Sequence, residues 1–512
     1  MSYDTYTSPL ASRNASKQML ELWSPRHKFN TWRRIWLAVA EAQHEMGLPV
    51  TKEQVEELRA VVTRPGGITD DEMKAAEKYE RELRHDVMAH VHALGDSCPK
   101  AKGIIHLGMT SQDVVCNADF IVFLDAGTII GRKLIRLIGL LADFAEKHKH
   151  TATLGFTHYQ PAQPATVGRR AAMWLQDVHL CFERLDGALN GMFARGIKGA
   201  TGTQAAMMAL LDHDGEKVDK FEQYVVDLLF RGGIRREGWG ESGEWEIPAG
   251  DELLRVTGQT YPRVIDTFIL ADLASCAAVL HKIATDIRLL SNRKELDEPF
   301  ESKQIGSSAM PYKRNPMRCE RICGLTRFVM NLVGNAYDTA ATQWLERTLD
   351  DSSNRRLSLP EAFLALDGAL DLMHNVASGL IVHEAMVRKN LMAELPFMAT
   401  ENILMACVKL GGDRQHYHEL IRQHAQAAGM RVKQEGLDND LLERLQNDKH
   451  FWSTTRGGPL REELDWAGVM DPMKYIGRSV EQTQRFIKEV VEPLREQYKD
   501  QLAKLEDNAP RV

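Results

Sequence analysis

Cysteine is scarce in this chain of 512 residues, and its seven cysteines are scattered without a C-x-x-C pair or zinc-like spacing. An odd number of isolated cysteines argues against a disulfide framework, so we expect reduced and mostly buried thiols. An excess of positive charge is also lacking. The net charge of -7 argues against nucleic-acid binding, and any anionic ligand must be held by a local cluster of cations.

Targeting and membrane signals are lacking as well. The first residues, MSYDTYTSPLASRN, contain no apolar core of a signal peptide, and no apolar run approaches the length of a bilayer span. There are no internal repeats or low-complexity tracts. We therefore expect a cytoplasmic globular protein that does not associate with membranes.

Helical periodicity dominates what is present. Apolar residues recur at spacings of three and four, without internal proline, over 117–150, 166–195 and 262–293. A helix of thirty residues is about 45 Å long, so such rods are expected to pack as a bundle. Shorter helices are predicted at 317–332, with Asn315 as N-cap and Pro316 at the first position, and at 360–379. Strand signals are weak, and the predicted fold class is mainly α.

The length and the pattern together predict three domains. They are an N-terminal mixed helical domain at 1–112, the long-helix bundle at 113–384 and a C-terminal helical domain at 385–512. The segment 231–251, rich in Gly, Trp and Glu, has no period and is expected to be an exposed insertion.

One stretch fits neither helix nor strand: IGSSAMPYKRNP at 305–316. Gly306 permits unusual backbone angles, two serines and the loop amides offer donors, and Lys313 and Arg314 offer charge. The N-terminus of the helix that follows adds a positive dipole. This loop is expected to wrap an anion.

A second polar cluster, RHDVMAHVH at 84–92, contains three histidines. No two of them have the i, i+4 spacing of a helical metal site, so we expect no metal. His90 and His92 are expected to be structural.

The loop resembles the signature G-S-S-x-M-P-x-K-x-N-P of the fumarase/aspartase superfamily, and its form is similar to that of the adenylosuccinate lyase family. Further similar motifs follow in the family's order: SPLASR (8–13), RHDVMAHVH (84–92), HLGMTSQDV (106–114), TLGFTHYQPAQ (153–163), KGATGTQ (198–204), TGQTY (257–261), ERTLDDSSNRR (346–356) and ELPFMATENI (394–403). The resemblance implies a three-domain fold whose central bundle is shared in a homotetramer, with each active site built from three subunits. It implies no cofactor.

The resemblance also implies the chemistry. Elimination of fumarate from an N-succinyl group needs a base, an acid for the departing nitrogen and donors for developing negative charge. Ser307 matches the family's base, His158 its general acid, and Lys313 and Glu320 their charged partners. In the alternative interpretation, Ser307 does not act as the base and only binds a carboxylate.

The substrates implied are adenylosuccinate and the succinylated aminoimidazole carboxamide ribotide (SAICAR). Residues expected to bind them are Arg13, which would hold phosphate, and Arg84, His85, Asp86, Thr110, Ser111, Gln259, Asn315, Arg321, Arg347, Ser352 and Arg356. Two alternatives stay open: another activity of the superfamily, which would not need Arg13, Arg84 and Arg321, and an inert structural protein on the same scaffold.

Overall fold

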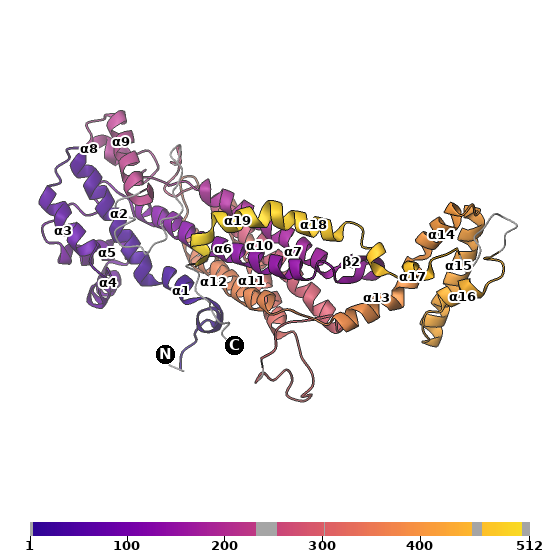
Figure 1. Cartoon of the computed structure of the whole chain (residues 1–512). Helices are drawn as coiled ribbons and strands as arrows, with labels where there is room; N and C mark the ends of the chain where they lie inside the picture. Colours follow the sequence, from indigo (N-terminus) through magenta and orange to yellow (C-terminus); the bar gives the residue numbers. More distant parts are fainter. Residues whose placement is uncertain (1–3, 232–252, 302, 453–462, 504–512) are drawn as a thin grey trace.

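The computed structural model describes residues 4–231, 253–301, 303–452 and 463–503. It is elongated, with the N-terminal helices at one end, a bundle of long helices in the middle and a small helical unit at the other end (Figure 1). The N-terminal elements are η1 (Leu10–Asn14), α1 (Lys17–Leu22), α2 (Pro25–Glu45), α3 (Lys52–Val62), α4 (Asp70–Leu83) and α5 (Asp86–Ser97).

The central bundle confirms the helices predicted from periodicity. Its members are α6 (Ser111–Lys147), α7 (Val167–Asn190), α10 (Val264–Asn292), α11 (Met317–Ala341) and α12 (Asp350–Ser378). Helix α10 packs on α11, α11 on α12, and α6 on both α7 and α12. Buried Leu, Ile and Phe side chains line these contacts, and each such side chain stabilises the fold by about 1.5–3 kcal/mol.

Two helix starts differ from prediction. Helix α11 begins at Met317, so its N-cap is Pro316 rather than Asn315, whose side chain is used inside the loop instead. Helix α12 begins at Asp350 and runs through Pro360, which was expected to start it. Acidic Asp350 and Asp351 occupy its first turn, where they complement the helix dipole.

The two short sheets are minor, which confirms a mainly α fold. Strands β1 (Ala152–Thr157) and β2 (Gln160–Thr166) form a hairpin with Thr157 paired to Gln160. Its two turn residues, His158 and Tyr159, have φ of 54° and 58°, as a type I′ turn requires. The other strands are β3 (Leu296–Asp297) and β4 (Ile381–Val382), also antiparallel.

The remaining elements lie at the two ends and along the bundle. Near the N-terminal helices are α8 (Ala205–Leu210), α9 (Gly215–Val226) and η2 (Asp227–Arg231); the predicted insertion at 231–251 otherwise lies outside the described residues. After the bundle come α13 (Glu384–Met398), α14 (Thr400–Lys409), α15 (Arg414–Met430), η4 (Arg431–Glu435), α16 (Leu441–Asn447), α17 (Trp466–Val469), η6 (Pro472–Lys474), α18 (Ser479–Phe486), η7 (Ile487–Val491), α19 (Glu492–Gln497) and α20 (Lys499–Ala503).

The described residues form two separate apolar cores. The larger contains residues from α2 through α12, so the N-terminal helices share it with the bundle, and α19 contributes Leu494. The smaller joins α14, α15 and α16 with Phe451 and Leu464. Helix α18 returns to pack on α7. The boundaries between the three predicted domains stay a prediction.

Among the described residues, α6 and α10 are long and apolar enough to cross a membrane, and the bent pair α13 and α14 would add a third span if taken together. The expectation that no segment approaches the length of a bilayer span was therefore wrong. A few polar residues interrupt each apolar run, but the mean hydropathy of the run stays high. The most apolar window is 89% buried in α6 and 44% buried in α10. Protein packing covers nearly all of the first and leaves much of the second exposed.

Candidate active site

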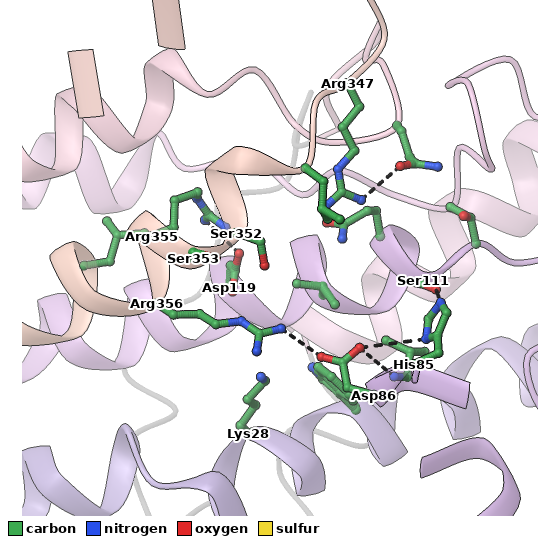
Figure 2. Close-up of a pocket in the computed structure, with 18 of the residues that line it drawn as sticks. Lys28, His85, Asp86, Ser111, Asp119, Arg347, Ser352, Ser353, Arg355 and Arg356 are labelled. Carbon is green, nitrogen blue, oxygen red and sulfur yellow. Dashed lines mark hydrogen bonds and ion pairs between the residues drawn. The ribbon is translucent and has the colours of Figure 1, made fainter. Parts of the chain in front are cut away.

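A cavity of about 730 Å³ lies between the N-terminal helices and the beginning of the bundle. Figure 2 shows its charged lining. Nine residues expected from the sequence to bind substrate come together there: Arg84, His85, Asp86, Thr110, Ser111, Gln259, Arg347, Ser352 and Arg356. They come from four separate segments of the chain, and folding brings these segments together around the cavity.

The turn between α4 and α5 presents His85. Arg84 ends α4 in the left-handed region, with φ of 54°, and His85 then caps α5. The Met88 N–H donates to His85 Nδ1 at 3.4 Å, so the ring proton belongs on Nε2, which lies 3.3 Å from Ser111 Oγ. His85 therefore lines the cavity beside Ser111, with its ring held by its own helix.

Asp86 is held from two sides. Its Oδ1 accepts from the Val87 N–H at 2.8 Å, and Arg356 Nη2 donates to its Oδ2 at 2.8 Å. Burial raises the pKa of Asp86, but these bonds and the charges of Arg356 and Lys28 outweigh burial and leave it below its usual value of 3.8. Asp86 is thus ionised at neutral pH and fixes the guanidinium of Arg356.

Thr110 and Ser111 stand at the N-terminus of α6. The Thr110 N–H donates to Asp113 Oδ2 at 2.7 Å. The other oxygen of Asp113 accepts from Arg195 and from the Lys198 and Gly199 N–H groups, both at 3.0 Å. Asp113 and Arg195 are fully buried. The contacts of Asp113 thus hold the hydroxyl groups of Thr110 and Ser111 at the N-terminus of a 37-residue helix, where the helix dipole is positive.

Arg347 is held on the opposite wall. Its Nη1 donates to Gln259 Oε1 at 2.9 Å, and Asp351 lies 3.8 Å from its Nη2. Asp351 is itself paired with the buried Arg263 at 2.7 Å. Burial lowers the pKa of Arg347 from its usual value, although Asp351 opposes this. The guanidinium is partly desolvated, so it pairs strongly with an anion.

Sequence reasoning missed several cavity residues: Lys28, Asp119, Ser353 and Arg355. Lys28 lies beneath Arg356 in Figure 2, with Nζ 4.8 Å from the Trp32 ring centre. Burial lowers the pKa of Lys28, and so does the charge of Arg356. In the sequence, a single Lys before a Phe on an amphipathic helix does not indicate a place in a binding cavity. Asp119, in contrast, is detectable in the sequence as an acidic residue within the long apolar helix α6.

The signature loop lies elsewhere, protruding from the bundle before α11 (Figure 1). Asn315 Nδ2 donates to the Gly306 carbonyl at 2.9 Å, which closes the loop. A Cβ on Gly306 would lie 2.1 Å from the Lys313 carbonyl oxygen, so only glycine fits. The Met310 N–H donates to Ser307 Oγ at 3.1 Å. Lys313 and Glu320 are exposed nearby in the chain.

Arg13 and Arg321 are associated with this second region. Burial lowers the pKa of Arg321, and the nearby charges of Arg13 and Arg318 lower it further, while Glu298 opposes them. The charge of Arg13 thus acts on Arg321, although the two residues are 308 positions apart in the sequence. Neither Arg13 nor Arg321 lines the cavity of Figure 2.

His158 forms a third group. It is exposed at the tip of the β1–β2 hairpin, and the hairpin packs against α13. Within the described part of one chain, no hydrogen bond or ion pair joins His158 to Ser307, Lys313 or Glu320. A single chain thus presents three partial sites: the cavity, the loop with Arg13 and Arg321, and the hairpin tip.

Comparison with known proteins decides the family. A family model described as "Lyase" matches residues 12–223 and 263–331, and one described as "Adenylosuccinate lyase C-terminus" matches 396–486. The adenylosuccinate lyase of Saccharomyces cerevisiae is 46% identical over 508 residues, covering 98% of this chain and 99% of that protein. The chain belongs to the adenylosuccinate lyase family. The resemblance found in the sequence motifs is confirmed.

Other members of the adenylosuccinate lyase family agree. The protein from Schizosaccharomyces pombe is 47% identical over 95% of this chain and 94% of its own length, and that from Schistosoma mansoni is 44% identical over 98% of both. Among solved structures, a 3-carboxy-cis,cis-muconate lactonizing enzyme from Pseudomonas putida has a TM-score of 0.75 at 23% identity, covering 94% of this chain and 98% of its own. A fumarate lyase from Mesorhizobium sp. BNC1 has a TM-score of 0.74 at 21% identity, covering 95% and 100%. These two solved structures share the fold of this chain over nearly its whole length.

Proposed function

We propose that this protein cleaves adenylosuccinate to AMP and fumarate, and SAICAR to the corresponding carboxamide ribotide and fumarate. The observation that carries the proposal is the cavity lined by Arg84, Arg347 and Arg356 in a chain with full-length likeness to adenylosuccinate lyases. Both substrates share a ribose phosphate and a succinyl group, so a site that binds these two ends accepts either base.

The charge of the site suits such a ligand. Six cations stand at motif positions of a chain whose net charge is -7: Arg13, Arg84, Lys313, Arg321, Arg347 and Arg356. A phosphate and two carboxylates require a local positive field of this kind. Planar guanidinium groups bind such oxyanions with two hydrogen bonds at once. Ser111, Thr110 and Gln259 supply neutral donors beside them.

The proposed chemistry divides two proton transfers. Ser307 as alkoxide removes the proton from the succinyl carbon next to the carbon that bears nitrogen. The electron pair forms the C=C bond of fumarate, the C–N bond breaks, and His158 as imidazolium protonates the departing nitrogen. The Met310 N–H on Ser307 Oγ favours the alkoxide, and Lys313 adds positive charge. Glu320 stabilises the imidazolium.

We propose a homotetramer whose sites are shared among subunits, so that these groups come together from more than one chain. Support comes from the three separated partial sites and from exposed apolar side chains on the bundle, including Leu180 of α7, Phe268 of α10 and Tyr337 of α11. Exposed apolar patches of this kind mark interfaces. Light scattering after size exclusion tests the subunit number; a monomer with full activity contradicts the proposal.

Complementation tests the sharing directly. Ser307→Ala and His158→Gln proteins, each inactive, are unfolded together, refolded and assayed. If one site takes His158 and Ser307 from different subunits, random assortment restores about a quarter of wild-type activity. If both residues act within one subunit, mixing restores nothing.

The activity itself is tested by fumarate release. The protein is incubated separately with adenylosuccinate, SAICAR, argininosuccinate, malate and aspartate. We expect fumarate from the first two alone. Fumarate from another substrate favours a different activity of the superfamily, and no turnover of any substrate favours an inert structural protein.

We also propose a cytoplasmic location. All seven cysteines are unpaired, six of them buried, as is usual in a reducing compartment. Fractionation of cells that produce the protein tests this, and recovery in a secreted or membrane fraction contradicts it.

A further inference from the structure

The N-terminal segment that carries Arg13 is anchored on the middle of α12. The Ser16 N–H donates to Asp367 Oδ2 at 2.6 Å, and both residues are buried. The other oxygen, Asp367 Oδ1, pairs with Lys133 Nζ at 2.5 Å, and Lys133 also pairs with Asp371 at 2.6 Å. Lys133 is 2% exposed and Asp367 fully buried, so these charges stabilise one another away from water.

The neighbouring residue of α12 completes the anchor. A Cβ on Gly368 would lie 2.7 Å from the Asn14 carbonyl oxygen and 2.9 Å from its carbonyl carbon. Contacts below 3 Å with backbone force a displacement, because backbone cannot swing aside as a side chain can. Gly368 has ordinary helical geometry, so its use here is close approach rather than an unusual φ. Asp367 and Gly368 together hold Asn14 and Ser16 on both sides of buried Ala15.

The anchored segment sets the position of one functional residue. Arg13 lies within the short helix η1, directly before Asn14, and its side chain is exposed. Its charge reaches Arg321 at the beginning of α11. Two guanidinium groups repel each other unless an anion lies between them, and an exposed arginine loses much rotamer freedom when it binds. A fixed backbone at Asn14 reduces the disorder that binding must overcome.

We propose that Asp367 and Gly368 are positioning residues that fix the backbone next to Arg13, so that its guanidinium binds the 5′-phosphate of the nucleotide. This inference rests on the proposed function. Helix α12 carries Ser352 and Arg356 at its cavity end, and the anchor lies eleven residues beyond Arg356, about 16 Å along the same helix. One rigid helix thus fixes both the cavity cations and the N-terminal segment.

The test isolates the Ser16 N–H. Ser16 has φ of -66° and Ala15 has φ of -70° with ψ of 147°, so proline fits at position 16 without backbone change. Ser16→Pro removes both the N–H bond to Asp367 and the hydroxyl that caps α1 through the Met19 N–H. Ser16→Ala removes only the hydroxyl and is the matched control.

A second pair tests the close approach. Gly368→Ala pushes against Asn14, whereas Gly429→Ala in α15 adds a methyl group that meets nothing within 4 Å. For all four variants, Km and kcat for adenylosuccinate are measured, together with inhibition constants for AMP and for adenosine. The inhibition constant of adenosine divided by that of AMP reports the contribution of the phosphate alone.

We expect Ser16→Pro and Gly368→Ala to lower this ratio by about tenfold, the value of one charge-assisted hydrogen bond, and to raise Km while kcat changes little. Ser16→Ala and Gly429→Ala should match wild type. An unchanged ratio in Ser16→Pro, or equal weakening of AMP and adenosine, overturns the inference. Failure of the wild type to bind AMP at all instead overturns the proposed function, and this inference with it.

Discussion

Arg356 of α12 binds Asp86 at the start of α5, with Nη2 2.8 Å from Oδ2, although the two residues are 270 positions apart in the sequence. The pair joins the N-terminal helices to the bundle, and both residues line the cavity. Because Asp86 already orients the guanidinium of Arg356, the remaining N–H groups of Arg356 are available to bind a ligand.

The first prediction concerns this pair. Arg356→Met should raise Km for adenylosuccinate by about tenfold to a hundredfold, since a charge-assisted contact is worth about 1.5–3 kcal/mol. Arg356→Lys keeps the charge but loses the planar fork, and should recover only part of the loss. Steady-state kinetics measure both.

The control for Arg356 is Arg422→Met on α15, which removes a similar exposed ion pair with Glu419 far from the cavity. Its Km should equal that of wild type. Equal effects of Arg356→Met and Arg422→Met would contradict a binding role for Arg356.

A second prediction concerns the loop geometry. Gly306→Ala places a methyl group 2.1 Å from the Lys313 carbonyl oxygen, which must open the loop closed by Asn315. Since a misplacement of about 1 Å can reduce turnover about a hundredfold, we expect kcat to fall by that order. Thermal unfolding should change little because most of the loop, residues 308–314, is exposed.

Gly103→Ala serves as the matched loop control, because a Cβ there meets nothing within 4 Å. It should leave kcat at the wild-type value. Near-normal turnover of Gly306→Ala would mean that the loop conformation of the free chain is not the active one.

Much of the fold was predictable because long helices repeat one signal many times. Helices α6, α7 and α10 follow their predicted ranges to within six residues at each end, since dozens of apolar positions fix the period. Single positions decide the errors. The sequence pattern predicts a helix start at Pro360, but the helix passes through Pro360, and only the N–H that would bond the Arg356 carbonyl is lost. The His158–Tyr159 turn carries none of the Asn or Gly that usually mark such hairpins.

The site was predictable as a set of residues and only partly as an arrangement. Motif positions named nine cavity residues, yet nothing in the sequence says that His85 lies beside Ser111 while Arg13 and Arg321 stay outside the cavity. Those groupings depend on tertiary packing. Lys28 and Arg355 were missed because a cation next to aromatic or apolar residues on a helix is common and gives no motif.

Lys28 is the subject of the third prediction. Its ammonium lies over Trp32 within the cavity lining, in the field of Asp86 and Asp119. Lys28→Met should lower kcat/Km by about tenfold through loss of one charged contact, and Lys28→Arg should restore most of it. Lys102→Met, which removes an exposed lysine paired with Asp96, is the control. Identical kinetics of Lys28→Met and wild type would exclude Lys28 from binding.

The fourth prediction concerns stability against pH. His90 is buried, stacked on Phe29 with ring centres 3.6 Å apart, and burial lowers its pKa from 6.5 to about 4. The unfolded chain takes up a proton below pH 6.5, whereas the folded protein does so only near pH 4. Stability is therefore lost as pH falls through this window, by about 2 kcal/mol between pH 6.5 and 5.

His90→Phe should remove that part of the pH dependence while keeping the aromatic stack. Urea unfolding at pH 7 and pH 5 measures it for both proteins. His27, whose pKa burial also lowers to about 4, contributes equally to both and cancels in the comparison. The same loss of stability in both proteins on going from pH 7 to pH 5 would show that His90 does not titrate as described.

The central claim is that Ser307 and His158, from separate segments, take and give the protons of one elimination. Fumarate release from adenylosuccinate by wild type, Ser307→Ala and His158→Ala measures it most directly, with AMP binding as the check that each site is intact. We predict rapid release by wild type and at least about a hundredfold lower kcat in each variant, with AMP still bound. Near-normal turnover by Ser307→Ala or by His158→Ala would contradict the account.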